Sequence, residues 1–527
     1  ATGETLVLDY TIKVTQNDAM ASSDTQMLRL VITGTNDVPT FDAVTNPADL
    51  NESAGDSSTQ NIAATTGTIS ITDRDLGDTL TVSVKGAATA AYNDGALPND
   101  AAVNINSLIA AGAISFDNDG FTSNGGQQTI NWTYNPDAAD LNWLRAGDTL
   151  TLTFVAQVND GTGNTGNQNL VITITGTNDA PIVSTEDVIG AVSELATASG
   201  TITDSGTLTF TDVDLNDLHT VSTVTASDGA LGTLTANVTT DTTGTGLGGV
   251  VTWNYSVAAA AVEYLAKDES KVETFTFNVE DGKGGSIART VTVTLTGTND
   301  SPDITVGAGD NATAGLSETN AVLTASGKLT VVDPDLTNTV NAVVDSVSIN
   351  GDSTFAGVNP LNNDALKAMV TVTNTAINAD SGDKNNLAWN FSSASSGDFD
   401  FLAAGETLVL DYTVKVTDDS AGATDTQTVT VTITGSNDAP VVSTEDVTSA
   451  VTELATASGT ITDTGTLSFS DLDLNDTHTV STVNPTPGAL GTLTASVSTD
   501  STGSGQGGVV TWNYSVAAAA VEYLAKD

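Results

Sequence analysis

The sequence predicts an all-β chain of tandem immunoglobulin-like Greek-key β-sandwiches in a linear array. The phrase Gly-Thr/Ser-Asn-Asp occurs four times, each copy followed after one residue by proline, at intervals of 142, 121 and 138 residues. A fixed phrase at this period indicates repeated domains of ordinary size. Between the phrases, Thr-rich and Val-rich stretches alternate between apolar and polar residues, which indicates half-buried strands.

Each phrase marks the end of one domain. It closes an alternating stretch such as residues 291–295, and the proline that follows favours an extended restart of the chain. The expected divisions are a partial repeat at 1–38, complete sandwiches at 39–179, 180–300 and 301–438, and a partial repeat at 439–527.

The two terminal segments repeat parts of the internal domains. Residues 180–268 and 439–527 align without a gap, and residues 3–10 are repeated at 405–412. We therefore expect the chain to be a window taken from a longer array.

Short strands fill each repeat. Alternation is clear at 207–210, 273–277 and 429–433, and about seven such strands per repeat predict a Greek-key sandwich. Residues 258–261 and 101–111 are the expected helical turns. A parallel β-helix is the alternative repeat fold, but its period would be far shorter, and its glycine-aspartate nonapeptide is absent.

The composition excludes several classes of partner. Sixty-five acidic against fourteen basic residues give a net charge of −51, which argues against nucleic acid and against anionic membranes. The chain has no cysteine, so no disulfide can stabilise it. No apolar run approaches the length of a membrane span, and direct membrane insertion is not expected.

Each repeat that contains the central strands also carries a Trp-X-aromatic step. Period-2 spacing places both rings on one face of a strand, and we interpret them as core residues. A platform for sugar rings is the alternative, and it would need the rings to be exposed. The pairs are Trp132/Tyr134, Trp253/Tyr255, Trp389/Phe391 and Trp512/Tyr514.

Acidic and amide residues recur in a fixed order. An early Glu precedes an Asp-X-Asp, an acidic turn and a late Asp follow near the end of the repeat, and the Asn-Asp of the phrase closes it. The candidate ligands are Glu4, Asn36, Asp37, Glu52, Asp73, Asp75, Asp148, Asp160, Asn178, Asp179, Glu194, Asp212, Asp214, Glu269, Asp281, Asn299, Asp300, Glu318, Asp333, Asp335, Glu406, Asp418, Asn437, Asp438, Asp471 and Asp473.

Strands that run alternately up and down bring these residues to the two ends of each sandwich, beside the linkers. Oxygen ligands that converge without His or Cys are typical of a calcium site, whereas magnesium prefers fewer protein ligands and is the second choice. The alternative interpretation is that the acidic turns are solvated surface, because Asp favours turns. The pattern at successive linkers favours calcium, bound weakly at about 10⁻⁴–10⁻³ M as in extracellular modules.

An enzyme is not expected. The only histidines, His219 and His478, occupy equivalent places in duplicate repeats, where we expect solvated surface residues. Asp pairs resemble glycosidase carboxylates, but they recur in every repeat, which suits a structural role. An array of carbohydrate-binding modules and a self-associating extracellular filament remain alternatives.

Across nearly the whole chain, the Gly-Thr-Asn-Asp-X-Pro endings, the Asp-X-Asp after Gly-Thr-Leu, the Trp-X-Tyr step and the late Asp-Gly turn resemble VCBS repeats. These are cadherin-like domains of giant secreted bacterial adhesins of the RTX type. The ligand order is also similar to that of cadherins, although the linker lacks the upstream Asp and second Asn, and Asp148 replaces Glu in one repeat.

This resemblance implies a stalk of a bacterial cell-surface adhesin, exported by type I secretion and acting in cell adhesion or biofilm formation. Calcium at the linkers would fix the angle between neighbouring repeats and so stiffen the stalk. The adhesive ligand would bind elsewhere in the full-length protein.

Overall fold

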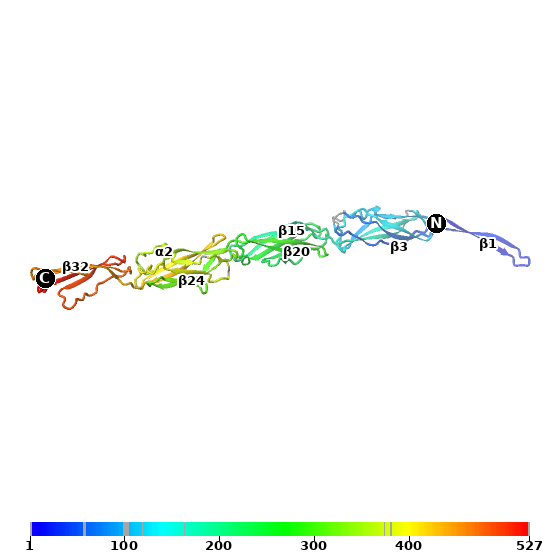
Figure 1. Ribbon diagram of the computed structural model, residues 1–527. Helices are drawn as coiled ribbons and strands as arrows, with labels where there is room; N and C mark the ends of the chain where they lie inside the picture. Colours follow the sequence, from blue (N-terminus) through cyan, green and yellow to red (C-terminus); the bar gives the residue numbers. More distant parts are fainter. Residues whose placement is uncertain are drawn as a thin grey trace. The chain divides into compact units, whose positions relative to one another are not determined.

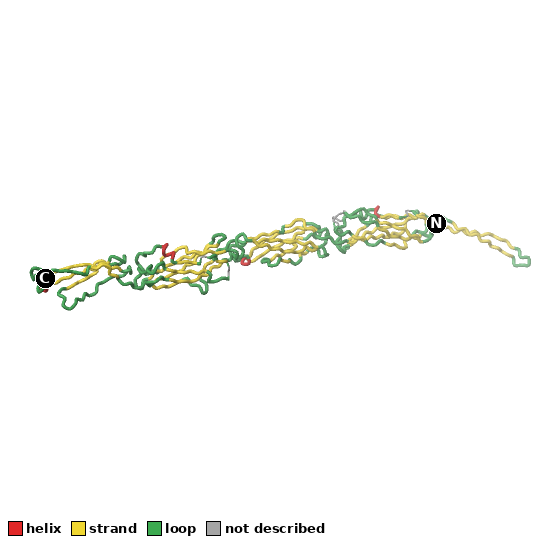
Figure 2. Tube along the Cα trace, viewed as in Figure 1, coloured by secondary structure: helices red, strands yellow, loops and turns green. Residues whose placement is uncertain are grey.

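The structure is a computed structural model, and it describes residues 3–55, 59–98, 105–117, 120–162, 164–373, 375–379 and 382–524. Strands and loops make up nearly all of this part of the chain (Figure 2), which confirms the all-β fold class. No described helix is long and apolar enough to cross a lipid bilayer. The helical segments are η1 (Ala111–Ala113), η2 (Ala259–Ala261), α2 (Asn363–Ala368) and α3 (Ala518–Val521).

The helical turns agree in part with the prediction. The turn expected at 258–261 is confirmed by η2. Of the turn expected at 101–111, residues 101–104 lie outside the described residues, and η1 begins at the end of that segment. The helix α2 (yellow-green in Figure 1) was not predicted. It is capped by Asn362, whose side chain accepts the backbone N–H of Ala365 at 2.8 Å, and it is too short to show a helical period.

The described chain forms two compact units. The linkers that contain Asn36 and Asn178 lie in the first unit, and those that contain Asn299 and Asn437 lie in the second. The first unit comprises Ala1–Val192, Thr203–Val257 and Val272–Thr294, and the second comprises Ser193–Ile202, Ala258–Lys271 and Leu295–Asp527.

The first unit begins with an antiparallel hairpin of β1 (Thr5–Thr15) and β2 (Ser23–Thr33), in which Thr5 pairs with Thr33 (Figure 1, blue). Most side chains of both strands are exposed, and Arg29 forms an ion pair with Asp9 at 2.8 Å across the ladder.

The sandwich at 39–179 follows, with two sheets of order β3-β5-β10-β8 and β4-β12-β11-β6-β9; β7 also pairs with β11. Its strands are β3 (Thr40–Thr45), β4 (Leu50–Asn51), β5 (Thr65–Thr72), β6 (Thr79–Val84), β7 (Thr89–Tyr92), β8 (Ile114–Phe116), β9 (Phe121–Thr122), β10 (Gln127–Tyr134), β11 (Thr149–Asn159) and β12 (Asn164–Thr175).

The sandwich at 180–300 has sheets of order β13-β15-β19-β18 and β14-β21-β20-β16, and β17 also pairs with β20. Its strands are β13 (Ile182–Glu186), β14 (Ile189–Ser193), β15 (Thr201–Thr211), β16 (Thr220–Val221), β17 (Thr225–Ala226), β18 (Thr233–Thr240), β19 (Gly249–Ala258), β20 (Ser270–Glu280) and β21 (Ser286–Thr296).

The second unit contains the sandwich at 301–438, with sheets of order β22-β24-β28-β26 and β23-β30-β29-β25-β27. Its strands are β22 (Asp303–Thr305), β23 (Thr313–Ser317), β24 (Thr324–Val332), β25 (Thr339–Ile349), β26 (Val370–Val372), β27 (Ile377–Asn378), β28 (Leu387–Ser392), β29 (Thr407–Asp418) and β30 (Thr424–Thr434).

The described residues after 438 form one four-stranded sheet of order β31-β32-β34-β33. Its strands are β31 (Val441–Glu445), β32 (Thr460–Ser470), β33 (Thr492–Thr499) and β34 (Gly508–Ala517).

The first strand of a sandwich is split between its two sheets, and this positions the early Glu. β3 pairs antiparallel with β5, whereas β4 pairs parallel with β12. In a parallel pair both strands end at the same pole, so Glu52, directly after β4, lies beside Thr177, two residues after β12. The parallel pairing of β23 with β30 places Glu318 beside Ser436 in the same way.

The Trp-X-aromatic step lies in the core. Trp132, Trp253 and Trp389 are at most 1% exposed, and the aromatic residue two positions later is equally buried. A sugar-binding platform built on these three pairs is therefore excluded.

Each of these tryptophans packs on a glycine of the neighbouring strand. Gly67 is the register partner of Trp132, and Gly327 is the partner of Trp389. A Cβ atom added at Gly327 would lie 2.5 Å from the indole nitrogen of Trp389, so the strand needs glycine there for close approach of the ring.

We predict that Gly327→Ala destabilises the sandwich at 301–438 by about 1–3 kcal/mol, because the added methyl overpacks the contact with Trp389. Urea unfolding followed by tryptophan fluorescence would measure the loss. Gly315→Ala is the matched control, since nothing lies within 4 Å of an added Cβ there. Equal stabilities for the two variants would contradict the prediction.

Candidate metal centres

The Asp-X-Asp motif directly follows a strand in every repeat. Asp73, Asp212, Asp333 and Asp471 come immediately after β5, β15, β24 and β32. Both aspartates of each motif are at most 6% exposed. The first accepts the backbone N–H of the second at 2.9–3.1 Å, which folds the motif into a tight acidic turn at the end of the sandwich.

The linker Asp is bonded to this turn through its backbone. In each of the four linkers, its N–H donates to the second Asp of the following Asp-X-Asp. The bonds are Asp37 to Asp75 at 2.7 Å, Asp179 to Asp214 at 2.8 Å, Asp300 to Asp335 at 2.9 Å and Asp438 to Asp473 at 2.8 Å.

The linker Asn is oriented by the late Asp. The Nδ2 group of Asn178 donates at 2.9 Å to Asp281, which comes directly after β20. Asn36 and Asn299 donate in the same way to Asp160 and Asp418, at 2.8 and 3.3 Å. The Oδ1 atom of all three asparagines is buried without a hydrogen-bond partner among the described residues, so a lone pair stays available inside the cluster.

Carboxylate oxygens in the same clusters also lack partners. Asp333 and Asp335 are fully buried, yet Oδ2 of the first and Oδ1 of the second accept no hydrogen bond from any group that the structure describes. The same is true of Asp73 Oδ2, Asp214 Oδ1 and Asp473 Oδ1. Buried polar atoms are normally satisfied, so convergent orphaned oxygens fit a hard divalent cation.

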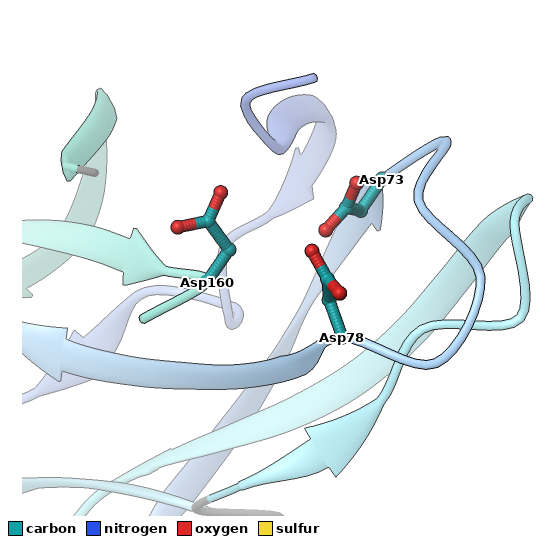
Figure 3. A group of neighbouring side chains, drawn as sticks. All are labelled: Asp73, Asp78 and Asp160. Atoms are coloured by element: carbon teal, nitrogen blue, oxygen red, sulfur yellow. The ribbon is translucent and has the colours of Figure 1, made fainter. Parts of the chain in front are cut away.

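A further ligand position escaped the sequence analysis. Asp78 contributes a carboxylate oxygen within 4.8 Å of those of Asp73 and Asp160, and the three side chains face one another in Figure 3. Asp217, Asn338 and Asp476 occupy the equivalent place, five residues after the first Asp of the motif. This constant spacing was the signal that could have identified them.

The linker Asp also belongs to a second cluster, formed with the preceding sandwich. Carboxylate oxygens of Glu194, Glu263 and Asp300 lie within 4.8 Å of one another, and each of the three residues has a buried oxygen without a hydrogen-bond partner. Glu318, Asp400 and Asp438 repeat this arrangement at the next linker. Sequence reasoning identified the early Glu and the linker Asp but missed Glu263 and Asp400.

The early Glu is held by the linker backbone. Glu194 accepts the N–H of Thr298 at 2.7 Å, and Glu318 accepts the N–H of Ser436 at 3.2 Å. One oxygen of each carboxylate is therefore fixed and the other points into the cluster. Asp300 thus joins the two clusters of its linker, through its backbone on one side and its carboxylate on the other.

Burial raises the pKa values of Asp214, Asp333 and Asp335, and neighbouring negative charges raise them further. The pKa of Asp214 rises to about 8, with Asp212 and Asp217 adding to the effect of burial. The pKa of Asp335 rises to about 7 for the same reasons, and that of Asp333 to about 6. A group of like charges out of water is unfavourable without a cation or a proton.

The turn acids directly before β11, β20 and β29 are Asp148, Glu269 and Glu406, and all three accept hydrogen bonds from protein groups. Asp148 forms an ion pair with Arg145 at 3.3 Å and accepts a hydrogen bond from the hydroxyl of Tyr92, so protein groups already satisfy it. Glu269 and Glu406 bond to the next sandwich instead, accepting from Thr337 at 3.2 Å and Asn475 at 2.7 Å. Glu4 is exposed.

The expectation of solvated surface histidines is wrong for His219. Its ring is fully buried between Asp212 and Asp241, with Nε2 2.9 Å and Nδ1 2.7 Å from their carboxylates. His478 is partly buried in the same arrangement with Asp471 and Asp500. Burial lowers the pKa of His219, but the hydrogen bonds to the two carboxylates outweigh it and raise the pKa overall. The histidine therefore orients the first Asp of the motif.

Comparisons with known proteins give a weak likeness. No family model matches the chain, so the resemblance to VCBS repeats stays a prediction. No curated protein matches it either.

Similar solved structures include cadherin ectodomains. Protocadherin Gamma B2 domains 1–5 align with 82% of this chain, with 12% sequence identity and a TM-score of 0.35. The Protocadherin GammaB4 extracellular domain aligns with 96% of this chain, with 15% sequence identity and a TM-score of 0.31. The chain covers 66% of each, just under two thirds. The human Desmocollin-1 ectodomain aligns with 96% of this chain over 79% of its own length, with 12% sequence identity and a TM-score of 0.26.

We predict that the metal-free protein loses thermal stability as the pH rises from 6 to 8. Asp214 and Asp335 have folded pKa values of about 8 and 7, above the ordinary value of 3.8. The folded state therefore holds these protons more tightly than the unfolded state, and this stabilisation is lost as the pH passes through the folded pKa. The raised pKa of His219 acts in the same direction. Calorimetry in metal-free buffer would measure it, and a higher melting temperature at pH 8 than at pH 6 would contradict it.

Proposed function

We propose that this chain is a structural spacer of an extracellular, adhesion-type protein, and that calcium binds at the linkers between its sandwiches. The observation that carries the proposal is the set of buried, partnerless oxygens that recurs at successive linkers. Asn299, Asp333 and Asp335 show it most clearly, since each has an oxygen that no described protein group satisfies.

Oxygen ligands alone support calcium over the transition metals. The clusters offer carboxylate and amide oxygens, and the histidines beside two of them are already held between carboxylates. Magnesium is the weaker alternative, because it prefers fewer protein ligands and retains water.

The mechanical consequence follows from charge. A bound calcium ion would neutralise the clustered carboxylates, which otherwise repel one another. Asp300 contributes its backbone N–H to the following sandwich and its carboxylate to the cluster of the preceding one. Neutralising both clusters would hold the linker in one conformation, whereas repulsion would favour its opening.

The wider setting rests on the sequence resemblance. As an array of VCBS-type repeats, the chain would be the extender of a secreted bacterial cell-surface adhesin of the RTX type, exported by type I secretion. It would project an adhesive tip in cell adhesion or biofilm formation. A net charge of −51 suits a surface that calcium stabilises outside the cell.

We predict that the double substitution Asp333→Asn, Asp335→Asn lowers the number of calcium ions bound per chain, because it removes two buried ligands of one linker. Isothermal titration calorimetry would count the ions for the variant and for wild type. Asp352→Asn is the control, since that acidic residue is exposed in a turn outside the clusters.

Small-angle scattering with calcium and with chelator would test the mechanical part. We expect wild type to change its profile on calcium removal. Calcium binding without any change of profile would leave the sites in place and refute stiffening. A wild-type chain that binds no calcium would overturn the proposal as a whole.

A further inference from the structure

The linker at 176–179 differs from the two that follow it. Each linker forms one cluster with the sandwich before it, called here the preceding-side cluster, and at 176–179 a protein amide lies in that cluster. The side chain of Gln60 is 5% exposed, and its Nε2 group donates to Asn142 Oδ1 at 3.0 Å and to Glu52 Oε1 at 3.4 Å. Glu52 is the counterpart of Glu194 and Glu318. Its second oxygen accepts the N–H of the linker residue Thr177 at 3.0 Å, so both of its oxygens are bonded. The linker carboxylate of this cluster, Asp179, accepts the backbone N–H of Gly55 at 2.6 Å.

The orientation of the Gln60 amide is fixed from the other end. Its Oε1 atom accepts the backbone N–H of Ser53 at 2.7 Å, so the Nε2 group must face the cluster. Backbone hydrogen bonds in both directions with Ala139 hold the residue in place. The donor is therefore built into the cluster rather than placed there by chance.

The equivalent residue in the other two sandwiches cannot supply such a donor. The backbone carbonyl of Gln60 accepts the N–H of Ala139, and the matching bonds are made by Gly200 with Ala259 and by Leu323 with Ser393. Glycine and leucine have no polar side chain. In those sandwiches the cluster keeps carboxylate oxygens that no described group bonds to, on Glu194 at 7% and Glu318 at 3% exposure.

The third ligand of the cluster has changed with Gln60. Asn142 lies two residues before Leu144, the place that Glu263 and Asp400 occupy before Leu265 and Leu402. The first cluster therefore has a neutral amide where the other two have a carboxylate. It has one negative charge fewer together with one hydrogen-bond donor more.

A second substitution adds a positive charge at the same linker. Arg145 pairs with Asp148 and Asp94, and its Nη1 group donates to the backbone carbonyl of Asn216 in the following sandwich at 2.7 Å. Alanine occupies the equivalent position in the other repeats, at Ala266 and Ala403. The chain itself thus supplies a cationic group that bridges this linker.

We infer that the linker at 176–179 closes its preceding-side cluster with Gln60 and Asn142 in place of a cation. It therefore binds one calcium ion fewer than the linkers at 297–300 and 435–438. The inference rests on the proposed calcium binding. The cluster that this linker forms with the following sandwich contains Asp214 and Asp217. It keeps oxygens without hydrogen-bond partners among the described residues, and it still binds a cation.

Two exchanges of residues between clusters test this inference on the whole chain. Gln60→Gly with Asn142→Glu copies Gly200 and Glu263 into the first cluster, and we expect the number of bound calcium ions to rise by one. Leu323→Gln with Asp400→Asn copies the first cluster into the third, and we expect the number to fall by one. Equilibrium dialysis with calcium measured by atomic emission would count the ions, and far-UV circular dichroism would check folding.

Asn237→Glu is the matched control, because it adds the same charge at an exposed position of β18 and should leave the count unchanged. If one exchange fails to fold, the other decides. Calcium binding by wild type with an unchanged count in the folded exchanges would overturn this inference alone. Absence of calcium binding by wild type would instead overturn the proposed function.

Discussion

The hydrogen bond from the linker Asp to the Asp-X-Asp turn is the interaction on which the linkers depend. It ties the first residues after one sandwich to the end of the next, at 2.7–2.9 Å in all four linkers. Once the backbone is held there, the carboxylate of Asp300 must point back toward Glu194, and the amide of Asn299 must point toward Asp418. The two clusters of a linker are thus consequences of one backbone contact.

Burying so many carboxyl groups is unfavourable, and the structure offsets it in different ways at different residues. Asp335 has its pKa raised to about 7 and has one oxygen without a partner. Asp212 is bonded to His219, and Asp148 to Arg145. Glu52 has Gln60. Linkers with the same phrase therefore differ in how much they need an external cation.

The strands and the buried aromatic pairs could be predicted because both follow from local alternation. Val291 and Val293 face the core with the period of two that the sequence shows. The positions of the Asp-X-Asp and the linker Asn-Asp could also be found, since they repeat at constant spacing. Glu263 and Asp400 could not, because the loop before them varies in length, and α2 gave no helical period. His219 was misjudged because burial depends on Asp241, which is distant in sequence.

The split first strand has a consequence for tension. In the sandwich at 301–438, the chain enters through β22 and β23 and leaves through β30, and β23 and β30 run parallel over five paired residues. A pull applied at the two linkers loads these strands in opposite directions along their length. Their hydrogen bonds must then break together in shear, not one after another as in a hairpin pulled open from its end. The same pairing that brings Glu318 to the linker makes the sandwich resistant to stretching.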